Sequence, residues 1–243
     1  MVVRGQFLER STVIPSGELY LDGLSHRGAL GPALLICPPH PSRGGSMDSA
    51  VCAELAFAAS HAGHATLRFN YRGVGASQGQ LGDFASFVED GRAALLTLQE
   101  NSPGLGVVIA GFDLGAEVAV ELAQGAAVEG VVVIGPVSKA YDFTALSRLR
   151  MKALVVVGEE DHGADRLALA ELCQSMGDGL VVIPEADHVF SQGLTELGRV
   201  VAQFLGGEGA RVLPVEEEDA GRDAVVREFD LDPGPDDEPD LDI

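Results

Sequence analysis

The sequence contains no tryptophan and only three cysteines among 243 residues. No apolar run approaches the roughly 20 residues of a membrane span, and the first ten residues lack the apolar core of a signal peptide. The cysteines, at Cys37, Cys52 and Cys173, are odd in number, lie in apolar segments and have no metal-type spacing. We therefore expect a cytoplasmic protein without a disulfide framework, a metal or another cofactor.

Basic residues are also scarce: 16 lysines and arginines face 37 acidic residues, which gives a formal net charge of −21 at pH 7. A chain of this sign repels phosphates, so neither nucleic acid nor a membrane surface is expected as a partner. The last 37 residues alone hold fourteen acidic residues and three arginines. Because such a segment buries little apolar surface, we predict a folded core over residues 1–206 and a disordered acidic tail over 207–243.

Two roles for this tail stay open. Its charge can serve solubility, or it can be a docking peptide for a protein partner, since disordered segments often fold on the proteins they bind. The docking role would use the apolar residues that lie within this acidic segment, namely Val225, Val226, Phe229, Leu231 and Leu241.

Short apolar segments alternate with helical patterns along the core. Two segments, 6–13 and 18–21, flank a turn at Pro15-Ser16-Gly17 and predict antiparallel strands at the start of the sheet. Further strands are expected at 33–37, 64–69, 107–110, 131–134, 153–157 and 180–183, and helices at 47–62, 83–101, from 114 onward, 167–176 and 194–205. This alternation predicts an α/β fold with a mostly parallel sheet covered by helices on both faces.

The most informative stretch is the turn Gly111-Phe112-Asp113-Leu114-Gly115, which lies between a buried strand and a helix. It has the form of the G-x-S-x-G nucleophile elbow, in which glycines allow a strained turn to lift the central side chain out of the sheet. The central residue here is Asp113 instead of serine. An ordinary helix N-cap is the competing interpretation of this aspartate.

Two other loops carry titratable side chains where strands end. In an open parallel sheet, the ligand crevice lies beyond the carboxyl ends of the strands. Asp161 follows the strand at 153–157, and His188 follows the strand at 180–183. The acids that compete with Asp161 are Glu159, Glu160 and Asp165. The chain order of Asp113, an acid and a histidine is that of α/β-hydrolases. Histidine suits proton transfer near neutral pH.

At these motifs the chain resembles the α/β-hydrolase superfamily, and in particular its small, cap-less bacterial branch of predicted hydrolases related to dienelactone hydrolases. The resemblance runs from about residue 33 to 205 and rests on Pro39-His40-Pro41, Gly44-Gly45-Ser46-Met47-Asp48, the run from Leu67 to Gly79, the elbow, Gly158-Glu159-Glu160-Asp161 and Ala186-Asp187-His188-Val189-Phe190. It implies an α/β-hydrolase fold without a cap domain and a small-molecule substrate.

The resemblance also implies roles for individual residues. His188 would be the general base, Asp161 the acid that orients it, and the backbone of Leu114 one oxyanion donor. The second donor would come from the loop at 40–45, at Pro41. The side chains of His40 and His162 are expected to be loop or surface groups.

The aspartate at the elbow leaves three interpretations open, including whether the protein is an enzyme. In the first, Asp113 is the nucleophile of a hydrolase that attacks an alkyl carbon. Relatives with that chemistry use tryptophan or tyrosine from a cap, whereas this chain has Tyr141 as the only tyrosine between 135 and 152. In the second, the protein is an inactive pseudo-hydrolase that binds through its cleft or its acidic tail. In the third, Asp113 or His188 activates water for ester hydrolysis, with Ser46 and Ser77 as nearby hydroxyls.

Overall fold

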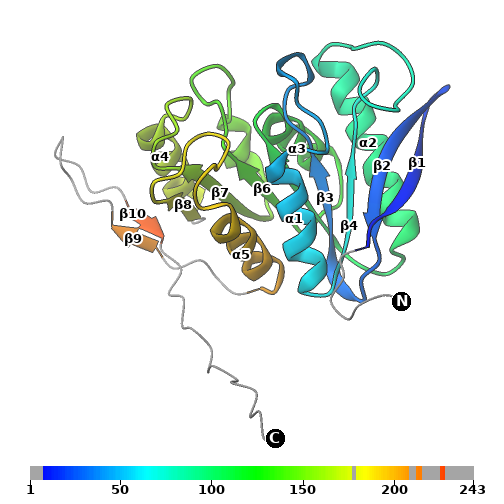
Figure 1. The fold of residues 1–243 in the computed structure, drawn as a ribbon. Helices are drawn as coiled ribbons and strands as arrows, with labels where there is room; N and C mark the ends of the chain where they lie inside the picture. The colour runs from blue at the N-terminus through cyan, green and yellow to red at the C-terminus, as the bar shows by residue number, and fades with distance from the viewer. Residues whose placement is uncertain (1–7, 177–178, 208–211, 215–224, 228–243) are drawn as a thin grey trace, which may run out of the picture.

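Eight strands form one sheet in the order β1-β2-β4-β3-β5-β6-β7-β8 (Figure 1). The structure is a computed structural model that describes residues 8–176, 179–207, 212–214 and 225–227. The strands of this sheet are β1 (Arg10–Ser16), β2 (Leu19–His26), β3 (Leu30–Cys37), β4 (His64–Phe69), β5 (Val107–Phe112), β6 (Gly130–Ile134), β7 (Lys152–Gly158) and β8 (Gly179–Ile183).

All pairs from β4 to β8 across the sheet are parallel, whereas β1 pairs antiparallel with β2, and β2 antiparallel with β4. The mostly parallel sheet with an antiparallel start is thus confirmed. The first turn lies later than expected, because Pro15 and Ser16 belong to β1 and the chain turns at Gly17. The proline is tolerated because β1 is an edge strand, where a missing N–H breaks no inner ladder.

Helices cover both faces of the sheet (Figure 1). Helices α1 and α5 pack on one face, and α2, α3 and α4 on the other. Their bounds are α1 (Ala50–His61), α2 (Phe84–Asn101), α3 (Leu114–Gly125), α4 (Arg166–Met176) and α5 (Leu194–Leu205), with short 3-10 helices η1 (Pro41–Arg43) and η2 (Thr144–Arg148). No helix among the described residues is long and apolar enough to span a bilayer.

Helix starts follow from capping side chains. Asp83 accepts a hydrogen bond from the Ser86 N–H at 3.0 Å and caps α2, as the sequence predicted. Helix α1 begins three residues later than expected, because Ser49 accepts from the Cys52 N–H at 3.2 Å and is its N-cap.

Alternate residues of a central strand feed two cores. In β5, Val107 and Ile109 belong to the core beneath α2 and α3, while Val108 and Ala110 belong to the core beneath α1 and α5. A strand buried on both faces needs apolar residues at every position, which explains the unbroken apolar run of this segment.

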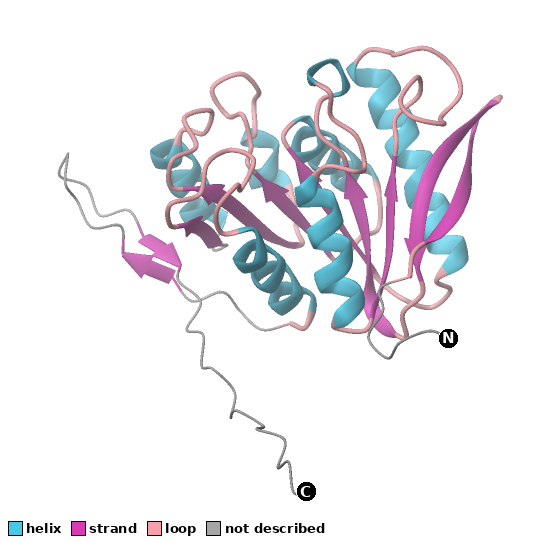
Figure 2. Cartoon of the chain, viewed as in Figure 1, coloured by secondary structure: helices cyan, strands magenta, loops and turns pink. Residues whose placement is uncertain are grey.

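The loops that follow the parallel strands gather at one edge of the sheet (Figure 2). The connection from β6 to β7, residues 135–151, holds only η2 and inserts no lid. This edge is therefore open, and the fold is that of an α/β hydrolase without a cap domain.

Most of the predicted acidic tail, including Phe229, Leu231 and Leu241, lies outside the described residues. Within 207–243 the structure places two short antiparallel strands, β9 (Val212–Pro214) and β10 (Val225–Arg227), which the sequence analysis did not predict. Strand β10 lies beside β8 (Figure 1).

The close packing of the elbow generates a stability prediction. A Cβ at Gly115 would lie 2.2 Å from the backbone oxygen of Cys37 and 2.6 Å from that of Pro38. We expect Gly115→Ala to lower the free energy of unfolding by about 3 kcal/mol, because β3 and α3 must separate. Urea denaturation measures this change.

Gly125→Ala at the other end of the same helix is the matched control, since its Cβ would meet nothing within 4 Å. It should leave stability unchanged or raise it by up to about 1 kcal/mol. Equal effects of the two substitutions would contradict the packing argument.

Candidate active site

Asp113 occupies a strained turn between β5 and α3. Its φ is 54° and its ψ is −119°, and it is one of three non-glycine residues with positive φ in the described chain. A conformation of this kind costs on the order of 1–3 kcal/mol. Asp113 occupies the N-cap position of α3, but its side chain makes no capping hydrogen bond to the helix, and its strained backbone is that of an elbow residue.

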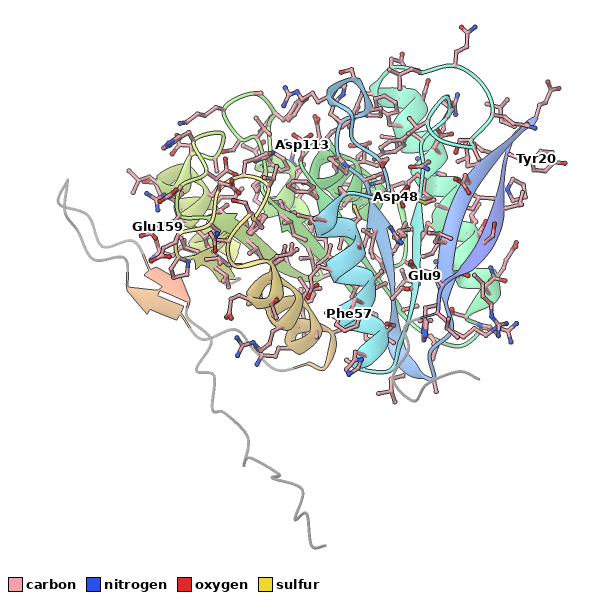
Figure 3. The ribbon with its side chains drawn as sticks, in the orientation of Figure 1. Glu9, Tyr20, Asp48, Phe57, Asp113 and Glu159 are labelled. Carbon is pink, nitrogen blue, oxygen red and sulfur yellow. The ribbon has the colours of Figure 1, made fainter. Side chains whose placement is uncertain are left out.

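The two oxygens of the Asp113 carboxylate have different surroundings. Oδ2 accepts a hydrogen bond of 2.9 Å from the backbone N–H of His40. Oδ1 is buried and has no hydrogen-bond partner among the described residues. It lies 3.8 Å from Nε2 of His188 and 3.8 Å from Nη1 of Arg43. Figure 3 shows Asp113 at the loop edge of the sheet.

His188 and Asp161 form a direct pair beside this carboxylate. Nδ1 of His188 lies 2.9 Å from Oδ2 of Asp161, whose Oδ1 accepts from the Gly163 N–H at 2.8 Å. Nδ1 therefore donates to the acid, and Nε2 is the nitrogen on the side of Asp113. The structure selects Asp161 among the candidate acids, because Glu159 instead accepts from the Glu185 N–H and Glu160 is exposed.

Mutual interaction shifts the pKa values of the pair in opposite directions. The hydrogen bond to Asp161 raises the pKa of His188 above its ordinary value, burial opposes this rise, and the charges of Asp161 and Asp113 add to it. Burial disfavours the charged form of Asp161, yet the hydrogen bond and charge of His188 bring the pKa of Asp161 below its ordinary value. The imidazole thus carries its proton to higher pH than a free histidine.

The proposed backbone donor at Pro41 is wrong, because proline has no N–H. The amide that reaches the site is that of the preceding residue, His40, through its contact with Asp113. The His40 side chain fixes the loop by accepting from the Ser42 N–H at 3.2 Å, at the start of η1. The Leu114 amide opens α3 and belongs to the first-turn N–H groups that lack a partner inside a helix.

Two neighbours of the site were missed from the sequence. Arg43 ends η1 and places its guanidinium beside Asp113 with 62% of the side chain exposed. The Phe112 ring lies 5.3 Å from the His188 ring, at 34° to it, and supports the imidazole. The signal for Arg43 was present, because it is the cation of the loop that the resemblance assigned to oxyanion binding. Tyr141 is close enough that Asp113 contributes, after burial, to raising its phenol pKa.

Other sequence candidates take structural roles. The Ser77 hydroxyl donates to the Asn70 carbonyl and accepts from the Asp22 N–H, and the Ser46 hydroxyl accepts from the Asp48 N–H. Both hydroxyls are thereby used in loop geometry. His162 is exposed. Among the described residues, no cluster of three or more His, Cys, Asp or Glu could hold a metal ion.

The mostly parallel sheet, the elbow after β5 and the His–Asp pair at its open edge define the class of fold: the chain has the α/β-hydrolase fold, without a lid. The family model for serine aminopeptidase, S33, matches residues 42–157. An uncharacterized protein of Rickettsia prowazekii is 27% identical over 186 residues, which cover 72% of this chain and 78% of its own.

Solved structures agree with this class. The structure of an alpha-beta serine hydrolase homologue from Coxiella burnetii is 27% identical, with a TM-score of 0.74 over 81% of this chain and 97% of the other. A serine hydrolase without lid from Xanthomonas campestris is 25% identical, with a TM-score of 0.71 over 81% of this chain and 92% of the other. The chain is thus similar to lidless serine hydrolases.

The His188–Asp161 pair generates a pH prediction. Because its folded-state pKa is raised, the stabilisation from protonated His188 is complete below its unfolded pKa of ~6.5 and is lost as pH rises through the raised value. Asp161→Asn removes the largest cause of the rise, so we expect the His188 titration midpoint to fall. NMR titration of its imidazole signals checks this, and an unchanged midpoint would contradict the assignment of Asp161.

Proposed function

We propose that the protein is a hydrolase of small substrates in which Asp113 is the nucleophile, His188 the general base and Asp161 the residue that orients it. The observation that supports this most directly is the asymmetry of the Asp113 carboxylate: a backbone N–H holds Oδ2, while Oδ1 is buried without a hydrogen bond. A carboxylate acting only as structure would be expected to have both oxygens satisfied.

The first step is attack of Oδ1 on an electrophilic alkyl carbon. A carbon–oxygen bond forms to Asp113, and the bond from carbon to its leaving group breaks with the electron pair on the leaving group. Carboxylates are ionised at neutral pH and need no base for this step, unlike the serine of related hydrolases.

The second step is hydrolysis of the resulting ester. Nε2 of His188 takes a proton from water, and the resulting hydroxide adds to the Asp113 carboxyl carbon. The bond from that carbon to the alkyl oxygen then breaks, and the imidazolium returns its proton to this oxygen, which leaves as the alcohol of the product. The ester carbonyl oxygen is then Oδ2, which already lies 2.9 Å from the His40 nitrogen. The negative charge of the tetrahedral intermediate therefore develops where a backbone donor is in place.

Alkylation also prepares the base. The charge of Asp113 is one of the causes that raise the pKa of His188. Esterification removes that charge, so the imidazole loses its proton more readily at the stage when it must act as a base. The contribution of Asp161 remains and keeps the ring oriented.

The comparisons support hydrolase activity in general, since the proteins from Coxiella and Xanthomonas are serine hydrolases or their homologues, and the aspartate nucleophile rests on the geometry of this site alone. A relation to dienelactone hydrolases stays a prediction. Water activation without a covalent step is a weaker explanation, because it gives no role to the Oδ1 atom of Asp113. The Ser46 and Ser77 hydroxyls already make hydrogen bonds within their loops.

An inactive pseudo-hydrolase is the second candidate, and a specific observation favours it. Oδ1 lies 3.8 Å from both Arg43 and His188, so Asp113 is also suited to a static role as an anion between two cations. In that case the cleft or the acidic tail would bind a partner. The two candidates differ in whether Asp113 forms a bond.

Covalent trapping tests the first candidate. In His188→Gln the second step should slow by roughly 10²–10⁴-fold, so the alkyl-enzyme should accumulate with 1-bromobutane or styrene oxide. Mass spectrometry of peptides should locate the added alkyl group on Asp113. Cysteine is a poor competitor, because burial raises the pKa of Cys52 to about 11 and that of Cys37 further. The double variant with Asp113→Ala is the control, and no adduct across a broad panel would exclude the mechanism.

Asp113→Ser separates the two candidates by esterase activity. If the aspartate has switched off an otherwise intact site, the serine variant should hydrolyse 4-nitrophenyl acetate while the wild type is inert towards esters and alkylating agents alike. If Asp113 is a working nucleophile, the wild type should turn over alkyl substrates and the serine variant should lose that activity by at least about 10³-fold. Initial rates on the two substrate classes give the answer.

A further inference from the structure

Arg43 is the arginine beside the nucleophile, and its guanidinium is largely unused. Its contact with Asp113, at 3.8 Å from Nη1 to Oδ1, is longer than a hydrogen bond, and 62% of the side chain is exposed. The guanidinium makes no hydrogen bond to another described residue. Two more deeply buried arginines differ from it: Arg72 is held by Asp90 and Glu89, and Arg68 by Glu9 and Asp48.

We propose that Arg43 binds a carboxylate of the substrate, so that the substrates are short carboxylic acids with the leaving group on the carbon next to the carboxylate. This inference rests on the proposed function and specifies its substrate class. The products would be the corresponding 2-hydroxy acids, formed with water as the only other reactant.

The distances favour this class. The attacked carbon must come within about 3–3.5 Å of Oδ1 for reaction. Arg43 Nη1 lies 3.8 Å from that same oxygen, so a group one bond away from the carbon falls within reach of the guanidinium. A carboxylate matches the planar fork of arginine with two parallel hydrogen bonds. The anion would thus hold the reacting carbon against Asp113.

Charge gives a second argument. A substrate carboxylate next to Asp113 brings two anions together in a protein whose net charge is −21. Without a cation that approach would be repulsive. Arg43 lies beside Oδ1 and offsets this repulsion, and the Tyr141 phenol, whose pKa is raised chiefly by burial, stays neutral and does not compete for it.

The loop that carries Arg43 is well defined. Ser42 donates to the His40 ring, and the His40 amide is bonded to Asp113. Gly44 closes η1 in the left-handed conformation with a φ of 81°, and its N–H donates to the Pro41 carbonyl at 2.9 Å. The position of Arg43 relative to Oδ1 is therefore set by the same loop that supplies the backbone donor.

Bromoacetate and bromoacetamide, which differ mainly in charge, test the proposal. We expect wild-type kcat/KM to be about 10–100-fold higher for bromoacetate than for bromoacetamide. This factor corresponds to the usual contribution of a hydrogen bond to a charged group. Arg43→Gln should remove this preference, and Arg43→Lys should keep part of it, because lysine retains the charge without the fork. Arg166→Gln, which replaces an exposed arginine at the start of α4, is the control and should change neither rate.

Binding without turnover separates this proposal from the proposed function. Acetate binding, followed by NMR shifts of the His188 ring, should weaken about 10–100-fold in Arg43→Gln and not in Arg166→Gln. Arg43-dependent acetate binding without turnover of any alkyl bromide would support the carboxylate site and overturn the proposed function. Turnover with equal rates for the two bromo compounds, unchanged in Arg43→Gln, would overturn the carboxylate site alone.

Discussion

The hydrogen bond from the His40 N–H to Oδ2 of Asp113 is the contact on which the arrangement of the site depends. It joins the loop after β3 to the elbow after β5, two neighbouring strands of the sheet. By holding one carboxylate oxygen, it leaves the other directed between His188 and Arg43. Without this contact, a flexible side chain on a strained turn would have no fixed orientation, and the difference between its two oxygens would vanish.

The backbone strain at the elbow is tolerated because the surrounding residues are tightly packed. The backbone of Asp113 is strained, and the strain persists only where neighbouring structure over-determines the conformation. Gly111 and Gly115 allow that structure, since a Cβ at Gly111 would lie 1.9 Å from the Gly115 carbonyl oxygen. The two cores on either side of β5 then hold the turn in place. The free-energy cost of the strained backbone at Asp113 is thus offset by the burial of apolar side chains in these two cores.

An aspartate at the elbow, where related hydrolases have a serine, places a second carboxylate beside His188. His188 lies between two carboxylates, Asp161 at hydrogen-bond distance and Asp113 at 3.8 Å. This arrangement favours the imidazolium. In the proposed mechanism, esterification of Asp113 would remove one of the two charges and so link the protonation of His188 to the covalent state of Asp113. Arg43 completes the balance on the open side of the site.

The sheet, the helices on both faces and the elbow could be predicted from the amino-acid sequence, because apolar periodicity and glycine spacing are local signals that this chain carries clearly. It also nominated Asp113, Asp161 and His188 as candidate site residues by their places after strands, and the structure brings the three side chains together. The tertiary contacts were needed to see which acid among 159–165 meets His188, that the amide of His40 and not Pro41 reaches the elbow, and that Arg43 lies beside Asp113. Those contacts depend on how loops from separate strands meet at the sheet edge. The spacing of residues within one segment of the sequence does not give the distance between side chains of two different segments.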